Sequence, residues 1–165
     1  MERYEYMMDT STESIVVYYS RTGSTKQAAG IIAGKLGCER VEIINRDRRK
    51  GVIGFLKSGF EAAGKKIVPI DPIQQDLSQY KRVILCTPIW ASNMSSPARS
   101  FLYAYKEKIQ NLCCLATCMD PKEDGKHLLD DLIELGFKVE TFAVAPKDRQ
   151  LSSAERFAEQ IKLLE

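Results

Sequence analysis

The sequence predicts an α/β fold in which helices cover both faces of a five-stranded parallel sheet. Three observations lead to this prediction. Five short apolar runs lack the polar alternation of half-exposed strands, which is typical of strands buried on both faces. Segments with helical periodicity separate these runs, as the crossovers of a parallel sheet require. No repeat, long linker or shift in composition divides the 165 residues, so we expect one main domain over residues 14–165.

The first predicted unit is a strand, a helix and a second strand. Residues 15–19 are a continuous apolar run and form the first strand. Residues 26–36 have helical periodicity and end at Gly37, because glycine readily adopts the left-handed conformation that follows a helix. Residues 40–44 form the second strand. The inward side chains of the helix are expected to be Ala28, Ala29, Ile32 and Leu36.

The second predicted helix, residues 51–65, is weaker, because Gly54 and Gly59 lower its helix propensity. Residues 67–80 follow as an irregular connection that carries two prolines. The side chains expected on the buried face of this helix are Phe55, Leu56, Phe60 and Ala63.

Residues 83–86 form the third strand, and a helix opens at Pro97, a residue favoured in the first turn of helices. Residues 112–117 form the fourth strand. The buried face of the helix between these strands is predicted to consist of Phe101, Leu102, Tyr105 and Ile109.

The last predicted elements are a helix over residues 123–135 with Gly136 as its stop, a fifth strand over residues 138–144, and a final helix. Ser152 and Glu155 have the spacing of a capping box, which would start that final helix. The apolar side chains expected to face the core from these two helices are Leu128, Leu129, Leu132, Ile133, Phe157, Ala158, Ile161 and Leu164.

The strongest functional signal is the segment Ser20-Arg21-Thr22-Gly23-Ser24-Thr25, which links the first strand to the first helix. Amides at the start of a helix lack intrahelical partners, and the helix dipole is positive there. These amides, the Ser and Thr hydroxyls of the segment and its single glycine are suited to binding a phosphate monoester. A Walker A loop would need Gly-Lys-Ser/Thr, and a dinucleotide fingerprint would need three spaced glycines. Residues 20–25 contain neither pattern, so both kinds of phosphate loop fit less well. A helix cap that binds nothing remains the alternative.

Ligands of parallel α/β sheets bind beyond the carboxyl ends of the strands. The loops expected to meet there are residues 20–25, 87–96 and 117–125. The residues alone therefore predict a phosphate-bearing ligand in a crevice between these loops.

Charge and rare residue types exclude several other classes. A net charge of +2 is too small to indicate a nucleic-acid-binding protein. The five cysteines contain no C-x-x-C pair, and His127 has no ligand-spaced partner, so no metal site or disulfide framework is indicated. Cys86, Cys113 and Cys114 are expected to be buried apolar residues. The basic run Arg46, Arg48, Arg49 and Lys50 fits a solvated loop or, alternatively, a docking patch for an acidic partner or a phosphorylated cosubstrate.

Targeting and membrane signals are absent from the sequence pattern. Met1 to Glu13 is polar and lacks the apolar region of a signal peptide, so we expect a short flexible N-terminal tail. No run approaches the roughly 20 apolar residues of a membrane span. These patterns favour a cytoplasmic protein with no membrane span.

With these elements in place, the chain resembles the flavodoxins, in their short-chain form. The family's phosphate loop has the pattern S/T-x-T-G-x-T, which residues 20–25 match at each defined position. Thr87-Pro88-Ile89-Trp90 and residues 97–102 resemble the family's second loop and third helix. Residues 54–60 resemble a helix of many flavodoxin-like proteins outside the best-known electron carriers. The resemblance covers nearly the whole chain after residue 13 and implies a three-layer αβα sandwich with strand order 2-1-3-4-5.

The resemblance implies non-covalently bound FMN. The phosphate would lie in the first loop, Thr87 near the ribityl chain and Trp90 against the isoalloxazine ring, with residues 117–119 near its pyrimidine edge or its other face. Cys118 would be a redox thiol or, as we favour, a spectator. No residue is assigned a catalytic or metal-binding role. The cofactor-binding residues implied are Ser20, Arg21, Thr22, Gly23, Ser24, Thr25, Thr87, Pro88, Ile89, Trp90, Asn93, Thr117, Cys118 and Met119.

Three departures from the family pattern bear on function. Residues 91–94 contain no glycine, residues 117–125 contain no aromatic residue, and the chain is slightly basic where electron-carrier flavodoxins are usually acidic. A flavodoxin-type electron carrier is favoured over a small FMN-dependent NAD(P)H:quinone-type oxidoreductase, and a flavin-free scaffold is third. The expected partner is a redox protein or a small-molecule electron donor or acceptor, and not nucleic acid. Oligomeric state is left open.

Overall fold

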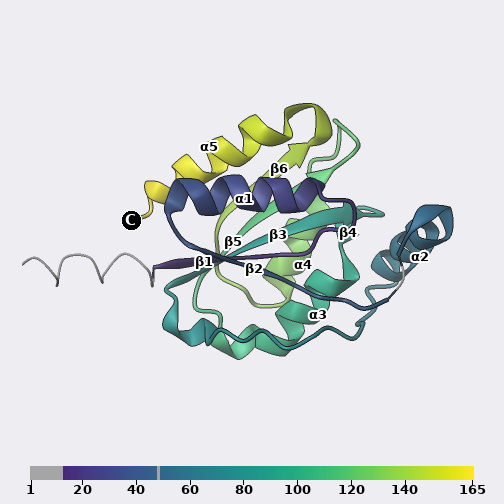
Figure 1. The fold of residues 1–165 in the computed structure, drawn as a ribbon, viewed down its shortest axis with the longest axis horizontal. Helices are drawn as coiled ribbons and strands as arrows, with labels where there is room; N and C mark the ends of the chain where they lie inside the picture. The colour runs from purple at the N-terminus through teal and green to yellow at the C-terminus, as the bar shows by residue number, and fades with distance from the viewer. Residues whose placement is uncertain (1–12, 48) are drawn as a thin grey trace, which may run out of the picture.

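A computed structural model describes residues 13–47 and 49–165 and contains the predicted parallel sheet (Figure 1). Its strands pair in the order β2-β1-β3-β5-β6, all parallel, and the short β4 pairs antiparallel with β3. Counted over the parallel strands alone, this is the predicted order 2-1-3-4-5. The strand bounds are β1 Ser14–Tyr18, β2 Glu39–Glu42, β3 Arg82–Trp90, β4 Asn93–Met94, β5 Leu112–Cys118 and β6 Val139–Pro146.

Helices cover both faces of the sheet and make the three layers expected (Figure 1). The pair α1 (Ser24–Leu36) and α5 (Gln150–Lys162) lies side by side on one face. On the other face lie α3 (Ser96–Tyr105) and α4 (Lys126–Glu134). The remaining helix, α2 (Gly51–Ala63), stands out at one end of the molecule, beyond the sheet.

Two hydrophobic cores explain why the strands lack polar alternation. In β1, Ile15 and Val17 point into the core under α3 and α4, while Val16 and Tyr18 point into the core under α1 and α5. Cys86 of β3 and Cys113 and Cys114 of β5 divide between the same two cores and have no exposed surface, which confirms the prediction for these three residues. Successive side chains of each central strand therefore enter apolar surroundings on both faces.

Two helix starts differ from the predictions. The predicted capping box is wrong, because α5 begins at Gln150 and the Ser152 hydroxyl donates to the Arg149 carbonyl at 3.1 Å. On α4, the helix starts at Lys126, and the carboxylate of Glu123 accepts the Gly125 amide at 2.9 Å in the irregular segment before it. Gly125 has φ 70°, and a Cβ there would lie 2.6 Å from the Val144 side chain.

The predicted inner face of α2 is wrong. Phe55, Leu56, Phe60 and Ala63 are exposed, and the opposite face, with Gly54, Ser58, Glu61 and Ala62, is the buried one. A buried ion pair between Glu61 and Arg49 fixes this orientation, because rotating the helix would leave both charges buried and unpaired. Ile133 of α4 and Leu164, beyond the end of α5, are also exposed where burial was predicted.

The predicted flexible tail, apart from Glu13, lies outside the described residues. Within residues 13–47 and 49–165, no helix has both the length and the apolar character needed to cross a membrane.

A second buried ion pair joins the two helices on one face of the sheet. Arg99 of α3 donates to Asp131 of α4, and both side chains are almost fully buried. Lys65 adds a second contact, 3.2 Å from the Asp131 carboxylate. This pair fixes the spacing of α3 and α4 beneath the sheet.

Replacing Asp131 with alanine should lower the free energy of unfolding by about 3 kcal/mol, because the Arg99 guanidinium would remain buried without a countercharge. Asp130→Ala, one residue away on the exposed side of α4, is the matched control and should change it by less than about 0.5 kcal/mol. Urea denaturation followed by circular dichroism measures both. Equal, small effects would show that the pair does not stabilise the packing of α3 on α4.

Candidate functional site

The loop after β1 leads directly into the start of α1. The chain leaves β1 at Tyr18, and α1 begins at Ser24, directly after Gly23. Gly23 has φ 98°, a conformation that side chains disfavour, and its amide donates to the Ser20 hydroxyl at 3.0 Å. Since the first amides of an α-helix have no acceptor within the helix, the positive end of α1 faces the carboxyl edge of the sheet.

Two hydrogen-bonded contacts tie this loop to other loops at the same edge. The hydroxyls of Thr25 and Thr117 lie 2.7 Å apart and are buried, so the start of α1 is joined to the end of β5. The Ser24 hydroxyl donates to the Gln150 side chain, whose amide nitrogen donates back to the Ser24 carbonyl at 2.6 Å. Both contacts hold the loop in place before any ligand binds.

A cavity of about 370 Å³ opens beside this loop. Most of the predicted cofactor-binding residues line it, and they come from the ends of β1, β3 and β5. Arg21 and Lys147 bring positive charge, and among the described residues that line it there is no carboxylate. The predicted residues in its wall are Arg21, Thr22, Ser24, Thr25, Pro88, Ile89, Trp90, Thr117, Cys118 and Met119.

Four predicted residues do not line this cavity. Ser20 and Gly23 stabilise the shape of the loop, because the Gly23 amide donates to the Ser20 hydroxyl. Thr87 is fully buried, and its hydroxyl lies 2.9 Å from that of Ser95. Asn93 lies in β4, and its side-chain amide donates to the Ala91 carbonyl at 2.7 Å.

The second loop forms a tight hairpin without a glycine. β3 continues through Trp90 and pairs back with Asn93–Met94, so Ala91 and Ser92 are its two turn residues. Both have positive φ, 48° and 61°, which is the conformation that this kind of hairpin turn requires. Although residues 91–94 contain no glycine, the chain therefore turns here in only two residues.

Trp90 is held in the cavity wall by aromatic and cationic neighbours. The Tyr19 ring meets it edge-on at a centroid distance of 5.5 Å, and the Arg49 guanidinium lies 5.5 Å from its centroid. Such contacts fix the plane of an aromatic side chain before a ligand arrives.

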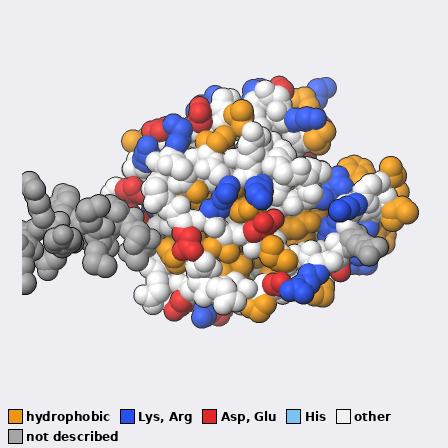
Figure 2. Space-filling view, viewed as in Figure 1, with side chains coloured by type: hydrophobic (Ala, Val, Ile, Leu, Met, Phe, Trp, Pro, Cys, Tyr) orange, Lys and Arg blue, Asp and Glu red, His pale blue; other side chains and the backbone are white. Residues whose placement is uncertain are grey.

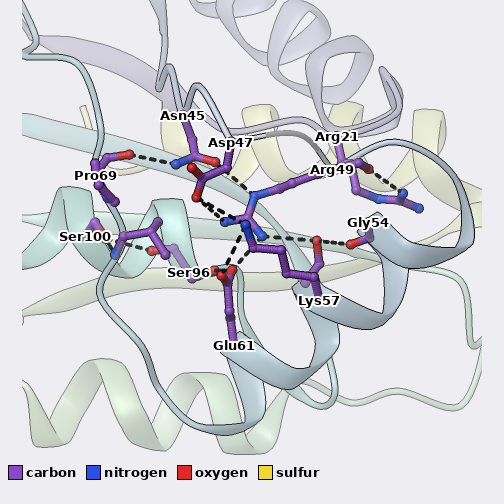
Figure 3. A network of polar contacts seen from close by, with 12 residues as sticks. Arg21, Asn45, Asp47, Arg49, Gly54, Lys57, Glu61, Pro69, Ser96 and Ser100 are labelled. Atoms are coloured by element: carbon purple, nitrogen blue, oxygen red, sulfur yellow. Dashed lines mark hydrogen bonds and ion pairs between the residues drawn. The ribbon is translucent and has the colours of Figure 1, made fainter.

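Arg49 is the centre of the polar network drawn in Figure 3. Its guanidinium contacts Glu61 at 2.6 Å, Asn45 at 2.9 Å and Asp47 at 3.5 Å. Gly54 is required here, because a Cβ would lie 2.1 Å from the Arg49 backbone. The network anchors α2 to the loop that follows β2.

The predicted basic patch is therefore only partly available to a partner. Arg49 is buried and paired, and Arg46 makes a two-pronged ion pair with Asp71. Arg48 lies outside the described residues, and Lys50 is exposed. The prediction of a solvated loop is wrong for Arg49, which serves the internal network, whereas Arg46 and Lys50 are exposed as that prediction expects.

Phe55 is a cavity residue that sequence reasoning assigned to the core. It projects from α2 into the wall of the cavity, and the Arg21 guanidinium lies 5.6 Å from its centroid. A second cavity, of about 230 Å³, shares Phe55, Ile89 and Trp90 with the first. It also borders Gly59, where a Cβ would meet no atom within 4 Å. We refer to these two adjoining cavities together as the crevice, because they share walls that include aromatic rings from α2 and β3.

Lys147, in the cavity wall, and Gln150, bonded to Ser24, were not among the predicted site residues. Both follow β6, whose carboxyl end lies at the same edge of the sheet as those of β1, β3 and β5. The loop after the fifth predicted strand was the signal that could have found them.

Cys118 lines the crevice as a protonated thiol. It is half-buried, and burial, reinforced by the charges of Glu123 and Asp120, raises its pKa to about 11. Its thiol donates to the Asp120 carbonyl at 3.2 Å. Over the described part of the chain, no three His, Cys, Asp or Glu side chains form a group that could hold a metal ion.

Cys118 should react slowly with iodoacetamide at pH 7, since a thiol with this pKa is ionised in only about one molecule in 10,000. The rate should rise steeply as the pH approaches 11. Mass spectrometry of timed samples measures it, with glutathione as the reference thiol and Cys118→Ser to identify the modified site. Alkylation at pH 7 as fast as that of glutathione would contradict a protonated, spectator thiol.

Comparisons with known proteins give structural relatives only. No known protein family and no curated protein matches the sequence. Among solved structures, a Bacteroides eggerthii protein described as a flavoprotein has a TM-score of 0.77 and 15% identity, over 92% of this chain and 97% of that one. A Lactobacillus acidophilus flavoprotein in complex with FMN has a TM-score of 0.69 and 18% identity, over 81% and 93%.

A flavodoxin from the domain Archaea has a TM-score of 0.58 and 15% identity, over 93% of this chain and 98% of that one. At identities this low, the similarity establishes the fold. The parallel strand order, the helices on both faces and these solved structures together show that this chain has the flavodoxin-like α/β fold.

Proposed function

We propose that this chain binds FMN non-covalently and acts as a flavodoxin-type electron carrier. The observation that carries the proposal is the crevice itself. One end is the hydroxyl-rich start of α1, and the other is walled by Trp90 and Phe55. A phosphate monoester at one end and a planar ring system at the other is the ligand chemistry that this arrangement favours.

The residues present fit FMN. The amides at the start of α1, the Thr22 hydroxyl and the cations Arg21 and Lys147 would hold the phosphate. Trp90 would flank the ring. Gly59 supports this fit, because its missing side chain leaves open space in the cavity next to Trp90. The Lactobacillus acidophilus protein of similar fold, which was crystallised with FMN, is consistent with the proposal.

FMN would supply the redox chemistry, and the protein would supply binding and orientation. The contacts of Trp90 with Tyr19 and Arg49 keep its ring fixed, so little conformational entropy remains to be lost when a ligand stacks on it. Cys118 and Met119 line the crevice on the side of β5. With its high pKa, the Cys118 thiol holds its proton and stays out of the electron transfer.

A small FMN-dependent NAD(P)H:quinone-type oxidoreductase is the second candidate. One observation favours it. A cavity of about 710 Å³ lies on the other side of the β1 loop, and its wall includes Arg21 and Lys50. An anionic dinucleotide could bind there beside the crevice.

The proposal is tested by adding FMN to the purified protein and following the quenching of flavin fluorescence. Saturable binding at 1:1 supports it, and a protein that ignores added FMN would refute it. The FMN-loaded protein is then given NADH or NADPH with a quinone. Multiple turnovers would support the oxidoreductase. Reduction by dithionite and reoxidation by a one-electron acceptor, without nicotinamide turnover, would support the carrier.

Gly23→Val should weaken FMN binding at least ten-fold, because the branched side chain strains the positive-φ backbone where the phosphate would approach it. Gly37→Val is the matched control: Gly37 also has positive φ, 64°, and no atom lies near its Cβ position, but it stands at the far end of α1. Fluorescence titration measures both affinities. Wild-type affinity in Gly23→Val would remove the first loop from the site.

Gly59→Leu should also weaken FMN binding by at least ten-fold, by filling the cavity beside Trp90, while leaving the folded state intact. Gly34→Leu is its control, since Gly34 is likewise a helical glycine with open space at its Cβ position, on the exposed side of α1. Each change should raise helix propensity by a similar amount. Equal affinities in the two variants would mean that the ring does not extend into the second cavity.

A further inference from the structure

The outward side of α2 carries an apolar surface that none of the described residues covers. Its five side chains have exposed fractions between 60% and 83%, and Figure 2 shows hydrophobic atoms gathered over this helix at one end of the molecule. We call it the α2 apolar face; it consists of Val52, Ile53, Phe55, Leu56 and Phe60.

The α2 apolar face is not buried against the other described residues of the chain. The opposite side of α2 packs inward and is held there by the Arg49–Glu61 ion pair and by the close fit of Gly54 on the Arg49 backbone. Since an exposed aromatic side chain has about 150–250 Å² of surface, the face presents on the order of 600 Å² of apolar area. Patches of this size usually mark an interaction site.

We propose that the α2 apolar face binds a second copy of this chain and forms a two-fold symmetric dimer. Two such faces packed together would bury roughly 1,200 Å² in total, which is at the lower end of stable protein interfaces. A two-fold axis brings the same patch together from both copies, and an apolar patch is complementary to itself. Because α2 stands out from the sheet in Figure 1, it is accessible for this packing.

The size and self-complementarity of the face favour a second copy, and one of the cations beside it is already paired within the chain. The Lys57 ammonium turns back toward Asp47 at 3.7 Å and Glu61 at 4.0 Å. Arg21 lies over the Phe55 ring, and Lys66 over the Phe60 ring at 4.8 Å. The pairing of Lys57 reduces repulsion between two copies, while Arg21 and Lys66 keep their positive charge above the neutral rings.

The dimer would also affect the crevice. Phe55 belongs both to the α2 apolar face and to the wall of the crevice. A second copy on this face would cover the outer side of α2 and restrict the movement of Phe55. This last consequence rests on the proposed function, whereas the dimer itself does not.

Sedimentation equilibrium of the FMN-free protein between about 1 and 100 μM tests the dimer independently of flavin binding. The wild type should have twice the mass of one chain at the upper concentrations. Ile53→Glu and Phe60→Glu should each raise the dimer dissociation constant at least 100-fold, because a charge would be buried in an apolar interface. Ile133→Glu, an exposed isoleucine on α4, is the matched control and should leave it unchanged.

Circular dichroism checks that each variant is folded, and Ile53→Ser is the milder change if a glutamate variant is not. A wild type that is monomeric at 100 μM would overturn the proposal. So would a dimer that persists in the folded α2 variants. Binding of a monomeric wild type to anionic phospholipid vesicles, lost in Ile53→Glu, would replace the second copy with a membrane surface.

Discussion

The parallel pairing of β1, β3, β5 and β6 is the constraint on which the site depends. Parallel strands end at the same edge of a sheet, so four loops that are far apart in the sequence meet there. The hydroxyl contact between Thr25 and Thr117, at 2.7 Å, joins two of these loops directly. The loop after β1 is positioned by this sheet edge, and its own hydrogen bonds complete its shape.

Arg49 connects this edge to α2. It lies buried between the loop after β2 and the helix, pairs with Glu61, and contacts the ring of Trp90. A buried charge with satisfied partners is costly to displace. The same side chain therefore fixes the orientation of α2, supports one wall of the crevice and leaves the apolar side of the helix facing outward.

The continuous apolar strands predicted the parallel sheet, because they are a local signal. The resemblance to flavodoxins, carried mainly by the residue pattern of the first loop, implied the strand order and most of the residues that line the crevice. The predictions were wrong where contacts between residues distant in the sequence determine the structure. The apolar stripe of α2 has helical periodicity and was assigned to the core, but the Arg49–Glu61 pair, 12 residues apart, turns it outward. Phe55 and Lys147 were missed for a related reason, because their roles arise only when distant elements meet at the sheet edge.

The central claim is that the start of α1 binds the phosphate of FMN. Comparing the affinities of FMN and riboflavin by isothermal titration calorimetry tests it most directly, since the two ligands differ only by that phosphate. Two or more charge-assisted hydrogen bonds, each contributing about 1.5–3 kcal/mol, predict that riboflavin binds at least 100-fold more weakly. Equal affinities for FMN and riboflavin would contradict the claim.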